Sequence, residues 1–200
     1  MNDPTPLIPP AAPTVDPGTG RLAPSTRHYE KRFSDLAGLY ADAAAFEALV
    51  PKLGSEVVYE VWEHKQSSAA GDLIFGTSVM KPGRVGDEFF VTRGHQHQLT
   101  DRAEIYHCVR GQGVMLLESP AGEVKALAMS PGVVAYVPPH WIHRSVNTGA
   151  DTLITVFCYS ADAGQDYDII ERSGGMRSRV VADGAGGWKL RDNPGWKPRD

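Results

Sequence analysis

The sequence predicts an all-β fold, either an antiparallel sandwich or a closed barrel, preceded by one short helix and an extended arm. Two observations indicate this class. Short runs in which apolar and polar residues alternate recur roughly every 8–12 residues, a spacing typical of sandwiches and barrels. Turn-forming residues separate these runs, since the chain contains 21 glycines and 15 prolines, and no helical pattern lies between them.

The N-terminal segment differs in composition from the rest. Residues 1–24 hold seven of the 15 prolines and predict an extended, partly polyproline arm that contributes little to a core. The arm either is disordered or lies along a partner subunit. Residues 25–200 are predicted to form a single domain, with the core barrel over about 55–190.

One helix is predicted before the strands. Asp42 has the side chain of a good N-cap. Phe46, Leu49 and Val50 follow at helical spacing and would form the buried face. Pro51 is predicted to end the helix, because proline lacks the backbone N–H that a further turn needs.

After this helix the period of the apolar pattern changes to two. Val57, Tyr59 and Val61 alternate with polar neighbours, as expected for a half-buried strand. The predicted strands cover residues 57–61, 73–80, 88–93, 103–109, 114–118, 124–129, 133–137, 152–159 and 179–182. Residues 184–200 are expected to add a closing strand and a docked tail.

Charge and cysteine content exclude several classes of partner. Twenty Lys and Arg against 24 Asp and Glu give a net charge of −4, which provides no basic surface for nucleic acid or anionic lipid. Two cysteines cannot form a disulfide framework. The first residues lack the pattern of a signal peptide, and no run of about 18 apolar residues occurs. We therefore expect a reduced, cytoplasmic protein that binds neither nucleic acid nor membrane.

Four residues have the chemistry of a metal site. His95 and His97 flank one residue in a strand-like stretch, so both imidazoles should point to the same face. Glu104 begins a later strand in which Tyr106 shares its face, and His143 lies far along the chain. Three neutral imidazoles and one carboxylate that converge inside a barrel suit a divalent cation with open coordination positions.

The surroundings of these residues resemble two sequence signatures of the cupin superfamily. Gly94–His97 with Glu104 and Gly111 is similar to the first signature, although six residues separate His97 from Glu104 where three or four are usual. Gly132–Asn147 is similar to the second. Cupins are small antiparallel barrels, so the resemblance implies a double-stranded β-helix, or cupin jelly-roll barrel.

The chain resembles one cupin branch in particular, the cupin-type phosphoglucose isomerases of archaea and some bacteria. The similar segments cover residues 71–83, 88–95, 101–106, 136–144 and 159–167, within a resemblance over roughly 13–200. The resemblance implies a homodimeric aldose–ketose isomerase that interconverts glucose 6-phosphate and fructose 6-phosphate in glycolysis and gluconeogenesis. It implies one divalent metal per subunit, Fe(II) first, with Mn, Ni or Zn as alternatives.

The resemblance also assigns roles by position. It places the metal ligands at His95, His97, Glu104 and His143, and the catalytic groups at Glu104, His143 and Tyr159. It places the phosphate contacts at Ser78, Thr92 and Gly94, and the sugar contacts at Tyr106, Tyr159 and Tyr167. Gln165 departs from the pattern, because the family typically has a histidine there.

Three function classes remain open from the sequence. Besides the isomerase, the same ligands with Fe(II) suit a cupin oxygenase, and a non-catalytic sugar-phosphate or metal-binding cupin is the third class. Ser78, Thr92 and Gly94 favour a phosphorylated ligand over the apolar substrate of an oxygenase. Gln165 favours the non-catalytic class, since an amide cannot transfer a proton. The residues fit an enediol route and a hydride shift equally.

Overall fold

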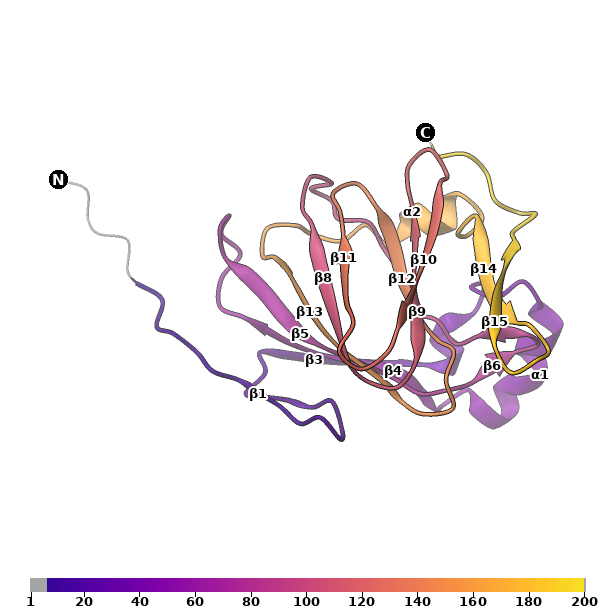
Figure 1. The fold of residues 1–200 in the computed structure, drawn as a ribbon, viewed down its shortest axis with the longest axis horizontal. Helices are drawn as coiled ribbons and strands as arrows, with labels where there is room; N and C mark the ends of the chain where they lie inside the picture. Colours follow the sequence, from indigo (N-terminus) through magenta and orange to yellow (C-terminus); the bar gives the residue numbers. More distant parts are fainter. Residues whose placement is uncertain (1–6, 200) are drawn as a thin grey trace.

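The computed structural model describes residues 7–199 and is built almost entirely of antiparallel strands (Figure 1). Its elements are β1 (Thr14–Val15), β2 (Leu22–Ala23), β3 (Arg27–Arg32), η1 (Phe33–Leu36), α1 (Ala43–Leu53), β4 (Val57–Lys65), β5 (Leu73–Met80), β6 (Arg84–Val85), β7 (Glu88–Phe89), β8 (Glu104–Arg110), β9 (Gly113–Glu118), β10 (Val124–Met129), β11 (Val134–Val137), β12 (Ile142–Asn147), β13 (Leu153–Ser160), α2 (Asp168–Arg172), β14 (Ser178–Ala182) and β15 (Trp188–Asp192). Within residues 7–199, no helix has the length and apolarity to cross a bilayer.

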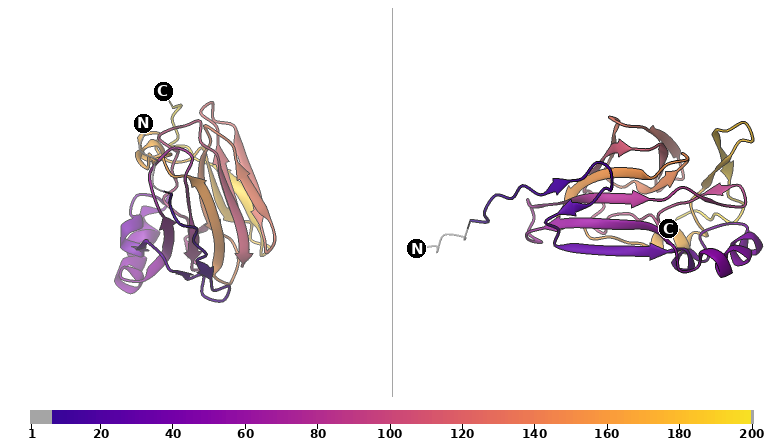
Figure 2. Two further views of the ribbon diagram at one scale, coloured as in Figure 1. Left: turned by 90° about the vertical axis from the view of Figure 1, so that its left-hand side faces the viewer. Right: turned by 90° about the horizontal axis from the view of Figure 1, so that it is seen from below.

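Two sheets form the body of the molecule. The larger has six strands in the order β11-β8-β13-β5-β4-β3, and the smaller has the order β10-β9-β12. They face one another, because Glu104 on β8 approaches His143 on β12 to 2.9 Å, and Figure 2 shows the two layers edge-on. A four-stranded sheet, β15-β14-β7-β6, continues the structure beside α1. The predicted all-β, jelly-roll fold of the cupin type is confirmed.

Alternation along β8 sets which side chains enter the space between the sheets. Glu104, Tyr106 and Cys108 are buried, whereas Ile105 between them is 42 % exposed. This confirms the predicted period of two. Residues of the smaller sheet complete the core, with Val114, Met115 and Leu116 at most 1 % exposed.

Helix α1 begins where the sequence predicts and ends later. The Asp42 side chain accepts a hydrogen bond from the Ala45 N–H at 2.8 Å, as an N-cap should. The predicted stop at Pro51 is wrong, since the helix continues to Leu53. Pro51 removes only one hydrogen bond this close to the end, and the Gly54 N–H still donates to the Val50 carbonyl at 2.8 Å.

Two strands beside the site were not predicted. Strand β3 has the sequence RHYEKR and lies at the edge of the large sheet, so it shows little apolar alternation. All six residues of β12 are buried, but four of them are polar. A search for apolar alternation therefore does not detect this strand. Conversely, the strand predicted over 88–93 ends at Phe89, and the following residues pair irregularly with β12.

The N-terminal arm is only partly detached. At residue 7 it lies away from the body, and it runs toward the body before β1 and β2 form a small hairpin (Figure 1). Leu22 is 1 % exposed, and the Thr77 hydroxyl donates to the Gly20 carbonyl at 2.5 Å. The end of the arm therefore contributes to the core, contrary to the expectation. Residues 1–6 of the predicted arm lie outside the described residues, and they include the segment expected to lack a signal peptide. The domain boundary at residue 24 stays a prediction.

Candidate active site

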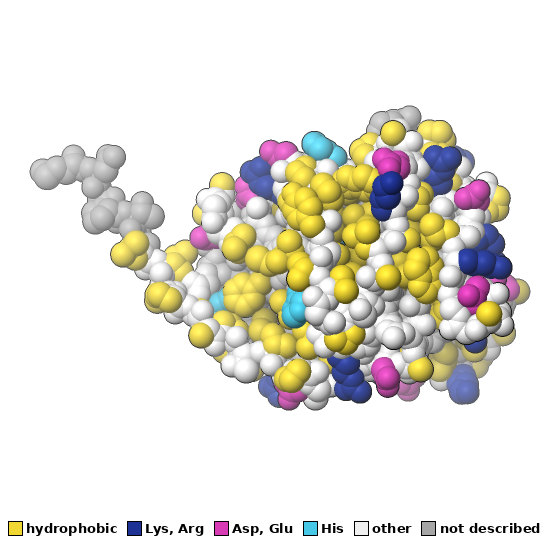
Figure 3. All heavy atoms as spheres, viewed as in Figure 1, with side chains coloured by type: hydrophobic (Ala, Val, Ile, Leu, Met, Phe, Trp, Pro, Cys, Tyr) yellow, Lys and Arg dark blue, Asp and Glu magenta, His cyan; other side chains and the backbone are white. Residues whose placement is uncertain are grey.

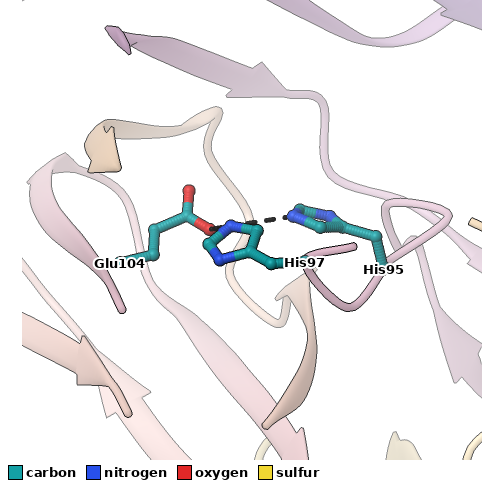
Figure 4. A group of neighbouring side chains, drawn as sticks. All are labelled: His95, His97 and Glu104. Carbon is teal, nitrogen blue, oxygen red and sulfur yellow. Dashed lines mark ion pairs between the residues drawn. The ribbon is translucent and has the colours of Figure 1, made fainter. Parts of the chain in front are cut away.

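A cluster of imidazoles around one carboxylate lies between the two sheets. Glu104 Oε2 lies 3.2 Å from His97 Nε2 and 3.7 Å from His95 Nε2, as Figure 4 shows. The third imidazole, His143, places Nε2 2.9 Å from the same oxygen. All four residues are at most 8 % exposed. The structure thus brings together the four predicted metal ligands from three distant stretches of sequence.

Irregular pairing with β12 positions the two neighbouring histidines. His95 and His143 exchange both backbone hydrogen bonds, at 3.0 and 3.1 Å, although His95 lies outside a regular strand. Gly94 interrupts the strand with a φ of 72°. A Cβ at Gly94 would lie 2.8 Å from the His143 carbonyl and from the Arg144 side chain, so only glycine lets the two segments approach.

Backbone carbonyls hold the rings of the cluster in place. His97 Nδ1 lies 2.9 Å from the Arg102 carbonyl, and His143 Nδ1 lies 3.4 Å from the Trp141 carbonyl. A bidentate ion pair with Asp162, at 2.7 and 3.0 Å, fixes the Arg102 side chain on this loop. Such contacts leave the opposite ring nitrogen, Nε2, to face a ligand.

The charges within the cluster shift the pKa values of its carboxyl group and its imidazoles. Burial alone would raise the pKa of Glu104, but the close contacts with His143 and His97 outweigh it and hold the pKa far below the usual range. Burial and the neighbouring His143 lower the pKa of His95 well below its ordinary value, which keeps this ring neutral at pH 7. For His97, burial acts downward, and the close contact with Glu104 more than offsets it, so the pKa rises.

The cluster fits a divalent cation. The ligand atoms of His95, His97 and Glu104 all lie within 4.8 Å of one another. His95 Nε2, His97 Nε2 and Glu104 Oε2 are buried without a well-formed hydrogen bond to any described residue. Buried polar atoms rarely stay unpartnered in this way, and three imidazole nitrogens with one carboxylate oxygen are a common donor set for first-row transition metals.

A small cavity of about 60 Å³ adjoins the cluster and collects the predicted substrate contacts. Its lining includes His95 and Glu104 together with all six predicted contacts, Ser78, Thr92, Gly94, Tyr106, Tyr159 and Tyr167. A second cavity of about 470 Å³ lies at its mouth, and Glu63, Tyr159 and Gln165 line both. These three shared residues show that the two cavities adjoin.

Four further polar residues line the inner cavity, and none of them was predicted from the sequence: Tyr29, Tyr59, Glu63 and Ser145. Tyr59 and Glu63 share a face of β4 with Val61, so the alternation of this strand could have indicated them. Tyr29 and Ser145 belong to the two strands that were not predicted, β3 and β12. No pattern in the sequence places those strands beside the lumen.

Gln165 connects two of the predicted sugar contacts. Its amide nitrogen donates to the Tyr159 hydroxyl at 3.5 Å, and its amide oxygen accepts a hydrogen bond from the Tyr167 hydroxyl. The Tyr167 ring also lies 5.6 Å from the His95 ring. The residue that departs from the family pattern therefore lies at the substrate cavity rather than on the outer surface.

Comparison with known proteins identifies relatives of this chain. Residues 30–197 match the sequence profile of the family described as glucose-6-phosphate isomerase. A glucose-6-phosphate isomerase of Sinorhizobium medicae is 57 % identical over 196 residues, covering 98 % of this chain and 92 % of that protein. One from Thermococcus gammatolerans is 44 % identical over 182 residues, covering 91 % and 94 %. Among solved structures, oxalate oxidase with glycolate overlaps 59 % of each chain with a TM-score of 0.48 and 14 % identity. The chain belongs to the cupin-type glucose-6-phosphate isomerase family.

Proposed function

We propose that this protein interconverts glucose 6-phosphate and fructose 6-phosphate with a divalent cation held by His95, His97, Glu104 and His143. The observation that carries the proposal is the buried cluster of three imidazoles and one carboxylate beside a cavity lined by hydroxyl groups. The reaction moves hydrogen between C1 and C2 of the sugar, so it needs a proton carrier and a means of stabilising charge on oxygen.

The cation is the Lewis acid of this proposal: when bound, it would stabilise negative charge that develops on the sugar oxygens by several kcal/mol. We propose one ion per subunit, Fe(II) first, with Mn, Ni or Zn as alternatives. Mixed imidazole and carboxylate donors accept all four, and cellular supply selects among them.

Glu104 can serve two roles because its oxygens differ in position. All three close contacts to imidazoles are made by Oε2. We propose that Oε2 is the ligand atom and that Oε1 carries a proton between C1 and C2 in an enediol route. His143 holds the carboxylate at 2.9 Å. Tyr159, which pairs with Glu104 across the strands and lines the same cavity, would direct its hydroxyl toward the reacting carbons. If the reaction instead proceeds by a hydride shift from one carbon to the other, Glu104 does not carry a proton between C1 and C2.

We propose that the phosphate group binds to the hydroxyls of Ser78 and Thr92 and to the Gly94 N–H. These residues line the inner cavity, and glycine lets a ligand approach the backbone closely. Ser78 is held in register by pairing of β5 with Val61 of β4 and Thr155 of β13. Tyr106, Tyr159 and Tyr167 would then contact the sugar through hydroxyl groups.

We also propose that the active protein is a cytoplasmic homodimer. A phosphorylated hexose is charged and stays in the compartment where it is made. Ile105, Val134 and Tyr136, on the outer face of β8 and its edge neighbour β11, are 42 %, 58 % and 56 % exposed. Figure 3 shows hydrophobic side chains gathered over this side of the molecule. An exposed apolar face at a sheet edge favours pairing of two copies.

A coupled assay tests the reaction. Purified protein is supplied with fructose 6-phosphate, and glucose 6-phosphate is detected by NADP reduction through a dehydrogenase specific for it. We expect turnover of fructose 6-phosphate by the wild-type protein. We expect no turnover of fructose, which lacks the phosphate, when the formation of glucose itself is measured. Oxygen uptake without isomerisation would instead support the oxygenase, and phosphosugar binding without either would support the non-catalytic cupin.

A further inference from the structure

A larger cavity lies on the other side of β12 from the imidazole cluster. It encloses about 400 Å³, within the range of about 300–1,000 Å³ that is usual for small-ligand sites. The backbone of β12 separates it from the lumen, since His143 and Ser145 face the lumen side while Arg144 lines this cavity. Within the described chain, Tyr167 is the one residue that lines both the inner cavity and this one.

Two arginines line this cavity, Arg144 buried and Arg179 half-buried, and each has a hydrogen-bond donor without a partner among the described residues. Arg144 is 7 % exposed and donates from Nη2 to the Arg93 carbonyl at 2.5 Å, while its Nε has no partner among residues 7–199. Arg179, from β14, donates from Nη1 to Glu88 at 2.8 Å and to the Leu39 carbonyl at 3.0 Å. Its Nε likewise has no partner within the described residues. A buried donor without a partner is unfavourable, so such groups usually have a ligand or a water molecule.

The acidic residues of the cavity do not neutralise Arg144. Glu88 is occupied by Arg179 and by the Ala41 N–H at 2.7 Å, and Asp35 accepts from the Arg32 N–H at 2.8 Å. Glu171 lies exposed on α2. Over residues 7–199, no carboxylate comes within 4.0 Å of the Arg144 guanidinium. Burial and the nearby charge of Arg179 lower the pKa of Arg144 to about 10, the direction expected for a buried cation that lacks a counter-ion.

We propose that this cavity is a second anion site, which takes a phosphate group, free or esterified, between the guanidinium groups of Arg144 and Arg179. Planar guanidinium groups bind phosphate through paired, charge-assisted hydrogen bonds, and the two unpartnered Nε–H groups would gain acceptors. Apolar residues of the wall, Leu116, Ile170 and Val180, leave room for a small organic part. The site differs from the substrate phosphate position, which has hydroxyl groups and a backbone amide.

Calorimetry with metal-loaded, full-length protein tests the site, using inorganic phosphate and glycerol 3-phosphate as probes. We expect two phosphate sites per subunit in wild type. Arg144→Gln should weaken one of them at least about tenfold, and Thr92→Val should weaken the other. Arg84→Gln, an exposed arginine outside this cavity, is the matched control and should leave both unchanged. Tighter binding of the ester would identify an organic phosphate as the ligand, and equal binding would identify the free ion.

Crystals of the wild-type protein grown with tungstate provide a measurement that does not depend on a buried variant folding. Anomalous density between Arg144 and Arg179 is expected. Ordered water alone at that position, or an Arg144→Gln protein that folds and binds phosphate as wild type does, would overturn the proposal.

Glu63 is a second buried carboxylate in the lumen, and the functions assigned above do not use it. It is 6 % exposed, and it lines both the inner cavity and its mouth with Tyr159 and Gln165. The one ion pair it makes within residues 7–199 is a long contact of 3.4 Å with Arg27. Burial raises the pKa of Glu63 although Arg27 acts in the opposite direction, and burial also raises the pKa of Tyr159. The Gln165 amide between them does not titrate.

We infer that Glu63 opens the sugar ring before hydrogen moves between C1 and C2, an inference that rests on the proposed function. Hexose phosphates are mainly cyclic in water, so the C1–O5 bond must break first. The Glu63 carboxylate takes the proton of the O1 hydroxyl as the C1=O1 bond forms, and it delivers this proton to O5 as the C1–O5 bond breaks. The raised pKa of Glu63 favours this proton transfer, the carboxylate ends in the state in which it began, and no further reactant is needed.

The test compares Glu63→Gln with Glu60→Gln, a control on the same strand whose side chain points to the outer face. Turnover of Glu63→Gln should fall about ten- to a hundredfold with metal content unchanged, whereas the control should match wild type. The double variant Glu63→Gln with Gln165→His should recover part of the rate, because histidine restores a titrating group at the same cavity. Wild-type turnover in Glu63→Gln would overturn this role alone. An inactive wild-type protein would instead overturn the proposed function.

Discussion

The two faces of strand β12 carry opposite electrostatic arrangements. On the lumen side, His143 joins two other imidazoles around the Glu104 carboxylate, with distances of 2.9 to 3.7 Å. On the other side, Arg144 lies buried without a carboxylate partner among the described residues. The comparison shows how one polar strand, buried on both faces, can line the proposed cation site and the proposed anion site through adjacent residues.

Glu104→Gln should have the largest effect, because it removes both a ligand charge and the proton carrier. We expect turnover to fall about 10²–10⁴-fold, while binding of a phosphosugar acid changes much less. Steady-state kinetics and calorimetry on the same preparation measure the two quantities. Turnover equal to wild type would remove Glu104 from the mechanism and with it the assigned role of the lumen face.

His143→Ala should lower metal affinity with the fold retained. Removing a residue that only supports a metal ligand typically lowers metal affinity about 10–100-fold, and removing a ligand should lower it at least as much. His107→Ala is the matched control, since this residue lies on β8 beside Tyr106 but on the opposite face. Metal content by mass spectrometry and the circular dichroism spectrum check the prediction. Full metal occupancy in His143→Ala would contradict a four-residue cation site.

Metal affinity should fall as the pH falls. The close contact with Glu104 raises the pKa of His97 against the effect of burial, so a bound cation must displace a proton from this ring when it is protonated. The pKa of His95 is lowered by burial, so this ring is already neutral and adds no proton. Below the pKa of His97, affinity should therefore drop about tenfold per pH unit for the displaced proton. Titration of Mn(II) or Zn(II) between pH 8 and pH 5 measures the slope, and a flat profile would contradict this charge arrangement.

Gln165→His should have the smallest effect. The glutamine bridges Tyr159 and Tyr167, and Glu63 already supplies a titrating group to the same cavity. We expect turnover to change less than about tenfold in either direction. A much larger gain, measured in the coupled assay, would show that Gln165 limits the reaction and that Glu63 does not replace the family histidine.

The lumen was far easier to predict from the sequence than the Arg144 cavity. Alternation along β8 correctly placed Glu104 and Tyr106 on one buried face, and the His-x-His spacing anticipated that both rings would converge. The resemblance supplied the substrate contacts, which the structure gathers around one cavity.

The remainder depends on tertiary packing that leaves no local pattern. At Gly94 the backbone leaves the regular strand conformation, and this segment pairs with β12 only through isolated bridges. Strand β12 is fully buried, but its four polar residues give no apolar pattern from which a strand could be predicted. From the sequence alone, Arg144 would be predicted to lie on the surface like most arginines. Nothing near it in the sequence indicates that β14 and the loop after η1 cover it. Glu63 could have been placed by the alternation of β4, but only pairing with β5 shows that this face lines the lumen.

Metal removal and reconstitution test the central claim most directly. Purified protein is treated with a chelator and dialysed, and isomerase activity is then measured before and after addition of Fe(II), Mn(II), Ni(II) or Zn(II). We predict that the chelated protein loses activity and that activity returns as the metal content reaches one ion per subunit. Full isomerase activity in protein shown to be metal-free would contradict a cation site at His95, His97, Glu104 and His143.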